Sequence, residues 1–341
     1  MVIDFKNLIL NKLCPNSEFE KKVVFFLEKW CSSSKTVDVQ TSGSTGTPKI
    51  FEIEKERMLH SAAMTCNFLH LQEGDTALLC LPIEYISGKM MVVRSLIKNL
   101  RLLITEPSIS PLNTLEQHIQ FCAMTPLQVE NSLDKLHLIQ KLIIGGAAVS
   151  ESLKNKIYTS LGEYQDITIF ETYGMSETLS HIALRQIFPK EEAYFTAFSG
   201  IKISTDERGC LKIDAPLLNQ EILQTNDLVE ITDENKFRFL GRVDNVINSG
   251  GAKIFPEKLE ALAKSKMEHE IVFIGVHDEV LGEKLIAVIE SEEQEELKSM
   301  VLNLDFEKKF HQPKAIYFIE KLPRTPNGKI SRLELKKLFS A

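Results

Sequence analysis

The sequence lacks the patterns that mark secreted, zinc-binding and membrane-spanning proteins. Its six cysteines are scattered and include no C-x-x-C pair, which favours reduced thiols in a cytoplasmic protein over disulfides or a zinc site. The first residues include Asp4 and Lys6, where a signal peptide would be apolar. The most apolar long stretch, residues 90–104, is interrupted by Arg94 and other cations, so we expect no membrane span.

The chain also has no excess of positive charge. It contains 40 Lys and Arg residues against 47 Asp and Glu residues, a net charge of −7, which argues against a general nucleic-acid binder. Any anionic ligand must therefore be held by local cations and backbone amides. The 341 residues are 43% hydrophobic, which is enough for a sizeable core and for two domains of roughly 100–200 residues each. The sequence contains no internal repeat and no low-complexity tract.

Residues 41–49 are the most informative segment, because they combine hydroxyl side chains and glycines with a terminal lysine. Backbone N–H groups in such a loop point inward and cradle phosphate oxygens. The spacing differs from the P-loop of ATPases, which needs four residues between its first Gly and Gly-Lys. The residues expected to bind phosphate are Thr41, Ser42, Gly43, Ser44, Thr45, Gly46 and Lys49.

The order of apolar patterns predicts an α/β fold with two domains. Strand-like and helical runs alternate up to residue 171, which favours a large domain with a mostly parallel sheet. Short β-runs between residues 195 and 240 predict a small antiparallel unit, and a small mobile α+β module follows. We expect domains at 1–243 and 244–341, and the first 36 residues give no clear expectation. The expected strands are 37–40, 50–53, 76–81, 101–105, 121–124, 141–144, 167–171, 271–276, 284–289 and 315–319, and the expected helices are 56–71, 88–99, 151–161, 256–264, 292–302 and 332–339, with a further helix opened by Pro126.

Two motifs follow predicted strands of the large domain. Gly145, Gly146 and Ala147 come directly after one strand, where small residues let a flat base approach the backbone. By itself, such a Gly-Gly pair is as often a plain turn. The segment 173–178, Tyr-Gly-Met-Ser-Glu-Thr, contains Glu177, and Mg²⁺ usually binds one or two carboxylates together with phosphate oxygens.

Later motifs lie on both sides of the predicted domain boundary. Asp227 follows Thr-Asn, and Arg242 follows a glycine; a carboxylate that accepts and an arginine that donates suit the hydroxyls of a ribose. Asp244 lies at the boundary. Residues 248–257 contain a Gly-Gly-Ala-Lys run. Residues 323–330 are rich in Pro and Gly, are expected to form a turn, and include Lys329.

The five motifs, taken in order, resemble those of the adenylate-forming superfamily, which includes acyl-CoA synthetases, firefly luciferase and peptide-synthetase adenylation domains. Ser176 stands where the family usually has Thr, and Asn226 where it usually has Gly. The resemblance covers residue 37 to the end of the chain, and typical members have a much longer region before the phosphate loop. The nucleotide-site residues that it implies are Gly145, Gly146 and Ala147 for the adenine pocket, Tyr173 and Gly174 for adenine stacking, Ser176 for the α-phosphate, Glu177 for Mg²⁺, and Asp227 and Arg242 for the ribose.

The resemblance implies an ATP- and Mg²⁺-dependent reaction in two halves. A carboxylate attacks the α-phosphorus of ATP with the help of Lys329, and a thiol such as that of CoA then attacks the acyl-adenylate and releases AMP. Between the halves the small domain rotates about a hinge that matches Asp244. A CoA channel is then lined by Gly250, Gly251 and Lys253.

The identity of the acid is less clear from the sequence. The segment 81–88 resembles a Pro-x-x-His-x-x-Gly region with Tyr85 in place of His, and it adds Ser87 and Gly88 as candidate pocket residues. Together with residues 180–185 it looks most like o-succinylbenzoate–CoA ligases of menaquinone synthesis. That acid keeps one carboxylate charged, so its pocket needs a cation or strong donors. The candidates are Arg94, which we favour, and His181, Arg185 and Lys89.

Two other functions stay open. One is a CoA ligase or carrier-protein-loading enzyme for another aryl or short-chain acid. The other is a nucleotide-binding relative without activity, which the joint presence of Glu177 and Lys329 disfavours. The sequence gives no oligomeric state.

Overall fold

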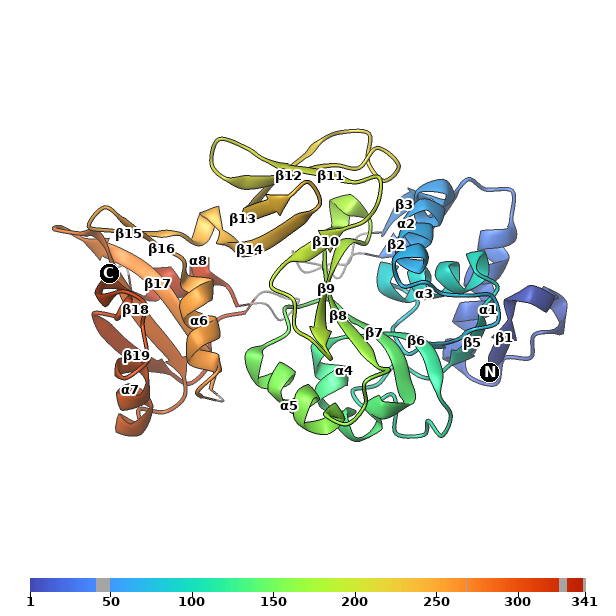
Figure 1. Ribbon diagram of the computed structural model, residues 1–341, viewed down its shortest axis with the longest axis horizontal. Helices are drawn as coiled ribbons and strands as arrows, with labels where there is room; N and C mark the ends of the chain where they lie inside the picture. Colours follow the sequence, from blue (N-terminus) through green and yellow to red (C-terminus); the bar gives the residue numbers. More distant parts are fainter. Residues whose placement is uncertain (41–49, 268, 325–329, 340–341) are drawn as a thin grey trace.

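The structure is a computed structural model that describes residues 1–40, 50–267, 269–324 and 330–339. The predicted phosphate loop at 41–49 and the segment with Lys329 lie outside the described residues, so the roles assigned to them stay predictions. Figure 1 shows a large body that contains the N-terminus and a smaller C-terminal body beside it. A 3-10 turn, Val243–Asn245, leads from one to the other.

A twelve-stranded sheet forms the centre of the large body in the described part of the chain. Its first half, from the edge inward, consists of β1 (Val2–Asp4), β5 (Arg101–Ile104), β4 (Thr76–Leu79), β6 (Ile119–Met124), β7 (Ile139–Ile144) and β8 (Thr168–Gly174). The strands β5, β4, β6, β7 and β8 run parallel to one another. Their carboxyl ends therefore meet at one edge of the sheet, where α/β proteins bind ligands.

The second half of the same sheet is antiparallel. It continues as β9 (His181–Phe188), β10 (Phe195–Ala197), β14 (Lys236–Arg242), β13 (Leu223–Asp233), β12 (Cys210–Asp214) and β11 (Lys202–Thr205). The expected antiparallel unit is thus present, and β9 and β10 join it to the parallel strands. This connection brings the end of β13 and β14 close to β8.

Helices cover both faces of the parallel strands. Along β4, Ala77 and Leu79 pack with one set of buried side chains, and Leu78 packs with the other, as the alternation of side chains in a strand requires. The first set includes residues of α1 (Glu18–Cys31), α2 (Lys55–Phe68) and α3 (Ile86–Ile97). The second includes residues of α4 (Pro126–Glu130) and α5 (Glu151–Leu161). None of the described helices is long and apolar enough to cross a membrane.

A short hairpin precedes α2. Strands β2 (Thr36–Gln40) and β3 (Ile50–Glu54) pair antiparallel, and Gln40 faces Ile50 across them. Gln40 also forms a parallel bridge with Tyr85, at the N-terminus of α3. Gln40 and Ile50, the described residues on either side of the predicted phosphate loop, are therefore adjacent, and Gln40 lies beside Tyr85, one of the predicted acid-pocket residues.

The C-terminal body is a separate α+β unit with its own core. Its sheet contains β16 (Ala252–Ile254), β15 (Ile247–Ser249), β18 (Gly282–Glu290), β17 (Ile271–Asp278) and β19 (Ala315–Ile319). The helices are α6 (Pro256–Lys264), α7 (Glu295–Leu302) and α8 (Arg332–Leu338). Its two hydrophobic clusters contain only residues from Ile247 onward.

The predicted elements agree with the structure most closely where a helix has a strong start signal. Ser150 caps α5 by accepting a hydrogen bond from the N–H of Leu153 at 3.1 Å, and Pro256 opens α6. Both helices have the predicted bounds, whereas α7 begins at Glu295, later than expected. The first 36 residues, which gave no expectation, contain β1 and α1.

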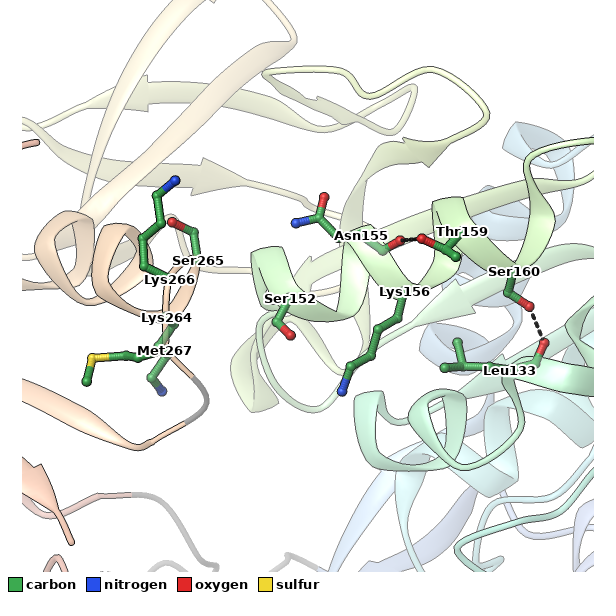
Figure 2. A pocket seen from close by; sticks show the side chains of 10 residues that line it. All are labelled: Leu133, Ser152, Asn155, Lys156, Thr159, Ser160, Lys264, Ser265, Lys266 and Met267. Atoms are coloured by element: carbon green, nitrogen blue, oxygen red, sulfur yellow. Dashed lines mark hydrogen bonds between the residues drawn. The ribbon is translucent and has the colours of Figure 1, made fainter. Parts of the chain in front are cut away.

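The two bodies face each other across α5 and α6 (Figure 1). A cavity of about 520 Å³ lies between them, and Figure 2 shows the side chains that line it. Two of its lysines already have acidic partners, since Lys156 pairs with Glu130 and Lys264 with Glu270. The cavity thus lies between the two bodies, and these two of its lysines are already neutralised by carboxylates.

Candidate active site

Three residues that are far apart in the sequence meet at the carboxyl end of β8. The hydroxyl of Tyr173 donates a hydrogen bond to Asp227 Oδ2 at 2.6 Å. Arg242 Nη1 donates to Asp227 Oδ1 at 3.2 Å. The tyrosine and the aspartate are 54 positions apart, so only the fold brings them together. These are the residues that the sequence assigns to adenine and ribose.

Tyr173 is held by other aromatic rings. Its ring centroid lies 4.9 Å from that of Phe237 in an edge-on arrangement and 5.8 Å from that of Phe195. Burial is the largest cause that raises the pKa of the Tyr173 hydroxyl, and the negative charge of Asp227 adds to it. Tyr173 therefore stays a neutral donor near pH 7, and it orients the Asp227 carboxylate.

The Gly145–Gly146 loop lies next to this group. It begins directly after β7 ends at Ile144, as predicted, and β7 pairs in parallel with β8. The N–H of Gly145 donates to the carbonyl of Met124 at 3.0 Å, and a Cβ on Gly145 would lie 2.7 Å from Thr172 Oγ1. The Gly145–Gly146 loop and the end of β8 with Tyr173 thus lie side by side at the carboxyl ends of adjacent strands.

Ser176 and Glu177 lie on an exposed 3-10 turn immediately after β8. The carbonyl of Glu177 accepts a hydrogen bond from Asn219 Nδ2 at 3.2 Å, and its side chain is exposed to solvent. Among the described residues, no group of three or more His, Cys, Asp or Glu side chains could hold a metal ion. A single accessible carboxylate fits Mg²⁺, which takes its other ligands from phosphate and water.

The predicted hinge residue is connected to the same group. Asp244 Oδ2 accepts from Arg242 Nη2 at 2.9 Å, and both Asp244 oxygens lie within 3.2 Å of Asn226 Nδ2. Asn226 Oδ1 in turn accepts from Arg208 Nη1 at 3.0 Å. A glycine at position 226 has no side chain to make these contacts, so this hinge network is a consequence of the asparagine.

A second polar group is buried beneath this edge, between α2, α3 and the start of β9. Arg94 is only 2% exposed, and its Nη2 donates to Ser180 Oγ at 3.1 Å. The Nε of Arg94 has no hydrogen-bond partner. His181 Nε2 lies 2.9 Å from Thr65 Oγ1. No acidic residue among those described forms an ion pair with Arg94.

Burial has a clear electrostatic effect on this group, which we call the Arg94 cluster (Thr65, Arg94, Ser180 and His181). Desolvation lowers the pKa of the Arg94 guanidinium to about 10, so it remains charged near pH 7. Desolvation is also the largest cause that lowers the pKa of His181, and the positive charge of Arg94 lowers it further. His181 is therefore neutral, and the cluster has one positive charge without a counter-charge.

The other two candidate cations have partners. Arg185 is paired with the buried Glu171, and its guanidinium stacks over Phe195 with 4.8 Å to the ring centroid. The amine of Lys89 donates to the carbonyls of Ile83 and Glu84. Of the four candidates for binding a second carboxylate, Arg94 and the neutral His181 lie together. Arg185 and Lys89 instead have structural contacts.

Two positions near the Arg94 cluster are glycine because another segment of backbone passes close to each of them. A Cβ on Gly174 would lie 2.4 Å from the Cα of His181, so glycine lets β8 and β9 come together beside the cluster. A Cβ on Gly88 would lie 2.3 Å from the carbonyl oxygen of Pro82, at the start of α3. Tyr85 and Ser87 precede Gly88 there, Tyr85 partly exposed and Ser87 exposed. Leu179, just before Ser180, has a φ of 67°, a strained value of the kind found at functional sites.

The predicted CoA-channel residues are in the small body. Gly250 and Gly251 form the turn between β15 and β16, and Lys253 is exposed on β16. Their role stays a prediction.

Sequence reasoning missed Thr65, Asn219 and Arg208. Thr65 had one available signal, a polar residue on the apolar side of a predicted helix. Asn219 and Arg208 lie in loops and had none. Each is placed by the packing of distant segments.

Known proteins resemble the chain over most of its length. The profile of the AMP-binding enzyme family matches residues 39–212, and that of the AMP-binding enzyme C-terminal domain matches residues 260–329. The 2-succinylbenzoate–CoA ligase of Listeria monocytogenes serotype 4b (strain F2365) is 27% identical over 358 residues, which covers 95% of this chain and 74% of that one.

Solved structures agree with these matches. A crystal structure of an acyl-CoA synthetase (AMP-forming)/AMP-acid ligase II-like protein from Dyadobacter fermentans DSM 18053 is 33% identical, with a TM-score of 0.68 over 99% of both chains. The O-succinylbenzoate coenzyme A synthetase of Bacillus subtilis, solved with ATP and magnesium, has a TM-score of 0.72 at 22% identity, over 88% of this chain and 69% of that one. The predicted fold class and the resemblance to the adenylate-forming superfamily are both confirmed, and the chain belongs to the AMP-binding enzyme family.

Proposed function

We propose that this protein is an AMP-forming acid–CoA ligase and that its acid is o-succinylbenzoate, as in menaquinone synthesis. The main support for this type of reaction is the contact of Tyr173, Asp227 and Arg242 beside the Gly145–Gly146 loop. This arrangement offers a flat ring, a diol acceptor and a cation at the carboxyl ends of parallel strands, as a bound nucleotide requires.

In the first half-reaction, a carboxylate oxygen of the acid bonds to the α-phosphorus of ATP, and the bond to pyrophosphate breaks. Two anions must meet, so the protein acts by positioning and by charge neutralisation. Lys329 serves between the carboxylate and the α-phosphate, and residues 41–49 hold the departing pyrophosphate. Glu177 would hold Mg²⁺, which would supply positive charge to the phosphates.

In the second half-reaction, the thiol sulfur of CoA bonds to the acyl carbon, the thiol proton is lost, and AMP leaves. The small body turns about Asp244, so that Gly250, Gly251 and Lys253 line the path of the pantetheine arm. The contacts of Asp244 with Asn226 and Arg242 belong to the arrangement seen here, and they must change when the hinge turns.

The Arg94 cluster supports an acid with a second negative group. A buried cation without a partner is costly, and the cost is removed when a ligand brings an anion. o-Succinylbenzoate brings one, because one of its carboxylates is activated and the other stays charged. Arg94 provides the charge, and Ser180, His181 and Thr65 provide neutral hydrogen-bonding groups around it. We assign Tyr85, Ser87 and Gly88, at the start of α3, to the same acid pocket.

We also propose a cytoplasmic location, where ATP and CoA are available. All six cysteines are free, and four of them are buried, in keeping with a compartment where thiols stay reduced.

The test is a thioester assay with purified protein, MgATP and CoA over o-succinylbenzoate, benzoate, and short and long fatty acids. CoA-dependent AMP release with o-succinylbenzoate alone supports both the reaction and the substrate. Turnover with a different acid keeps the reaction and rejects the substrate. ATP binding without turnover of any acid rejects the proposal in favour of carrier-protein loading or nucleotide binding alone.

A further inference from the structure

Glu171 is a buried carboxylate in β8 that no step of the proposed reaction uses. It is only 4% exposed, and it lies two positions before Tyr173 on the same strand. Its Oε1 accepts the N–H of Val149 at 2.9 Å, and its Oε2 pairs with Arg185, which faces it across β9. A buried carboxylate is costly unless its oxygens have partners. Here the two partners come from two different segments, so one side chain ties both to β8.

The contact with Val149 holds the far end of the Gly145–Gly146 loop. The near end is held by the hydrogen bond from Gly145 to the carbonyl of Met124 in β6. Val149 is buried, and it is the last residue before Ser150, which caps α5. The loop is therefore fixed at both ends by hydrogen bonds, and one of them depends on Glu171.

The contact with Arg185 reaches the ring of Tyr173 through other side chains. The Arg185 guanidinium lies 4.8 Å from the ring centroid of Phe195, and its Nε has no hydrogen-bond partner among the described residues. The Phe195 ring lies 5.8 Å from that of Tyr173 and stacks on Phe237 at 5.6 Å. The carboxylate of Glu171 thus fixes a guanidinium that covers one of the rings against which Tyr173 packs.

We propose that Glu171 and Arg185 are positioning residues of the nucleotide site, which hold the Gly145–Gly146 loop and the Tyr173 ring in fixed positions for the adenine. This role rests on the proposed function, in which the loop and Tyr173 bind that base. A charge-assisted hydrogen bond fixes direction as well as distance. A site whose parts are held in place before the ligand arrives loses less free energy to ordering when the ligand binds.

The proposed role determines which part of the ligand is affected when the ion pair is broken. AMP and ATP carry the same base and ribose, so both should lose affinity by the same factor. The Michaelis constant for the acid should not follow. A residue that only stabilised the fold would lower the fraction of active protein and leave the dissociation constant of that fraction unchanged.

The experiment measures the binding of AMP and of MgATP to Glu171→Gln by titration calorimetry, without acid or CoA. Glutamine keeps the shape and an acceptor oxygen for the N–H of Val149, but it loses the charge that pairs with Arg185. We expect both nucleotides to bind about five- to tenfold more weakly than to the wild-type protein, a size usual for residues that act on a ligand through others. The number of sites per folded protein should stay at the wild-type value. In steady-state assays, KM for ATP should rise and KM for the acid should stay within about twofold.

Glu260→Gln provides the matched control in the small body. Glu260 also accepts a backbone N–H, that of Phe273 at 2.9 Å, and its two oxygens lie 2.7 Å and 2.6 Å from Nη2 of Arg332. The variant loses the same kind of shielded ion pair in the other body. We therefore expect it to bind AMP as the wild-type protein does, and thermal unfolding shows which variants are folded at the assay temperature.

A second variant, Arg185→Lys, addresses the same contact if Glu171→Gln does not fold. Lysine keeps the charge but lacks the planar group that covers Phe195, so AMP and ATP should again lose affinity by one common factor. Unchanged AMP affinity in the folded variant overturns the proposal, and so does an equal loss in Glu260→Gln. A loss for ATP without a loss for AMP also overturns it, because the effect would then lie at the phosphates.

The wild-type protein separates this proposal from the proposed function. If it binds AMP but turns over no acid, the ligase function is rejected, and the comparison of dissociation constants still decides the role of Glu171. If it binds neither AMP nor ATP, both proposals are rejected.

Discussion

Arg94 in the large body and Arg332 in the small body are both shielded from water, yet their surroundings are opposite. Arg332 Nη2 donates to both carboxylate oxygens of Glu260, and Nη1 donates to the carbonyl of Phe273. Arg94 has a serine hydroxyl, a methionine sulfur 3.9 Å from Nη1, and an Nε without a partner. Arg332 therefore has a counter-ion within the protein, whereas Arg94 has none among the described residues.

The difference indicates two kinds of function. A buried ion pair that satisfies all its groups fixes geometry, and adds little net stability. A buried cation without a partner destabilises the free protein, and it therefore favours the binding of a ligand that brings an anion. The paired Arg332 therefore fixes geometry within the small body, and we propose that the unpaired Arg94 in the large body recognises the acid.

The largest effect is expected on the positioning side. Lys329→Ala should lower ATP–pyrophosphate exchange by about 10²–10³, the scale for removing one transition-state donor, and leave ATP binding nearly unchanged. Exchange and equilibrium ATP binding measured on the same preparation check this. Near-normal exchange would show that Lys329 is not the reacting lysine.

The next effect concerns the movement between the two states of the small body. Asp244→Pro fixes φ at the hinge, so it should leave adenylation intact and slow thioester formation about tenfold or more. Single-turnover assays of each half-reaction separate the two. Equal loss of both would place the hinge elsewhere.

A pH measurement tests the recognition side. The folded pKa of His181 is lowered by burial and by Arg94, below its ordinary value of about 6.5. Its contribution to stability is therefore fully present above about pH 6.5 and is lost as the pH falls, because the unfolded chain binds the proton first. We therefore expect the free energy of unfolding to be lower at about pH 5.5 than at about pH 7.5.

Denaturant unfolding at pH 7.5 and 5.5 measures this loss, and His181→Gln provides the comparison. The variant cannot take up the proton, so its stability should change less between the two pH values. The same pH dependence in both proteins would mean that other groups cause it and that His181 is not held neutral beside Arg94.

The smallest effect is expected where the two sides meet. Asn226→Gly removes the amide that contacts Asp244, an exposed interaction of about 0.5–1 kcal/mol, so the balance of the half-reactions should shift by about two- to fivefold toward thioester formation. The ratio of the two half-reaction rates gives the answer. An unchanged ratio would show that the asparagine does not influence the hinge.

The sequence predicted what depends on local signals. The ends of α5 and α6 follow from Ser150 and Pro256, and the glycine loop after β7 follows from the strand before it. The nucleotide-site residues could be named because they occur in recognisable motifs.

The sequence could not predict contacts between distant segments. Thr65 meets His181 across 116 positions, and Glu260 meets Arg332 across 72. No periodicity relates such pairs. The sequence favoured Arg94 over Arg185 because Arg94 interrupts an apolar run, but it did not show that Arg185 has Glu171 as a partner. The contrast between a paired and an unpaired arginine therefore became visible only in three dimensions.

The most direct test of the account compares two acids in the wild-type protein and in Arg94→Gln. One is o-succinylbenzoate, and the other is the same acid without the carboxylate that stays charged. We predict that the wild-type protein prefers the diacid by about 30-fold or more in kcat/KM, and that Arg94→Gln loses this preference while it still turns over the monoacid. An unchanged preference in Arg94→Gln, or no preference in the wild-type protein, would contradict the recognition of a second carboxylate by Arg94.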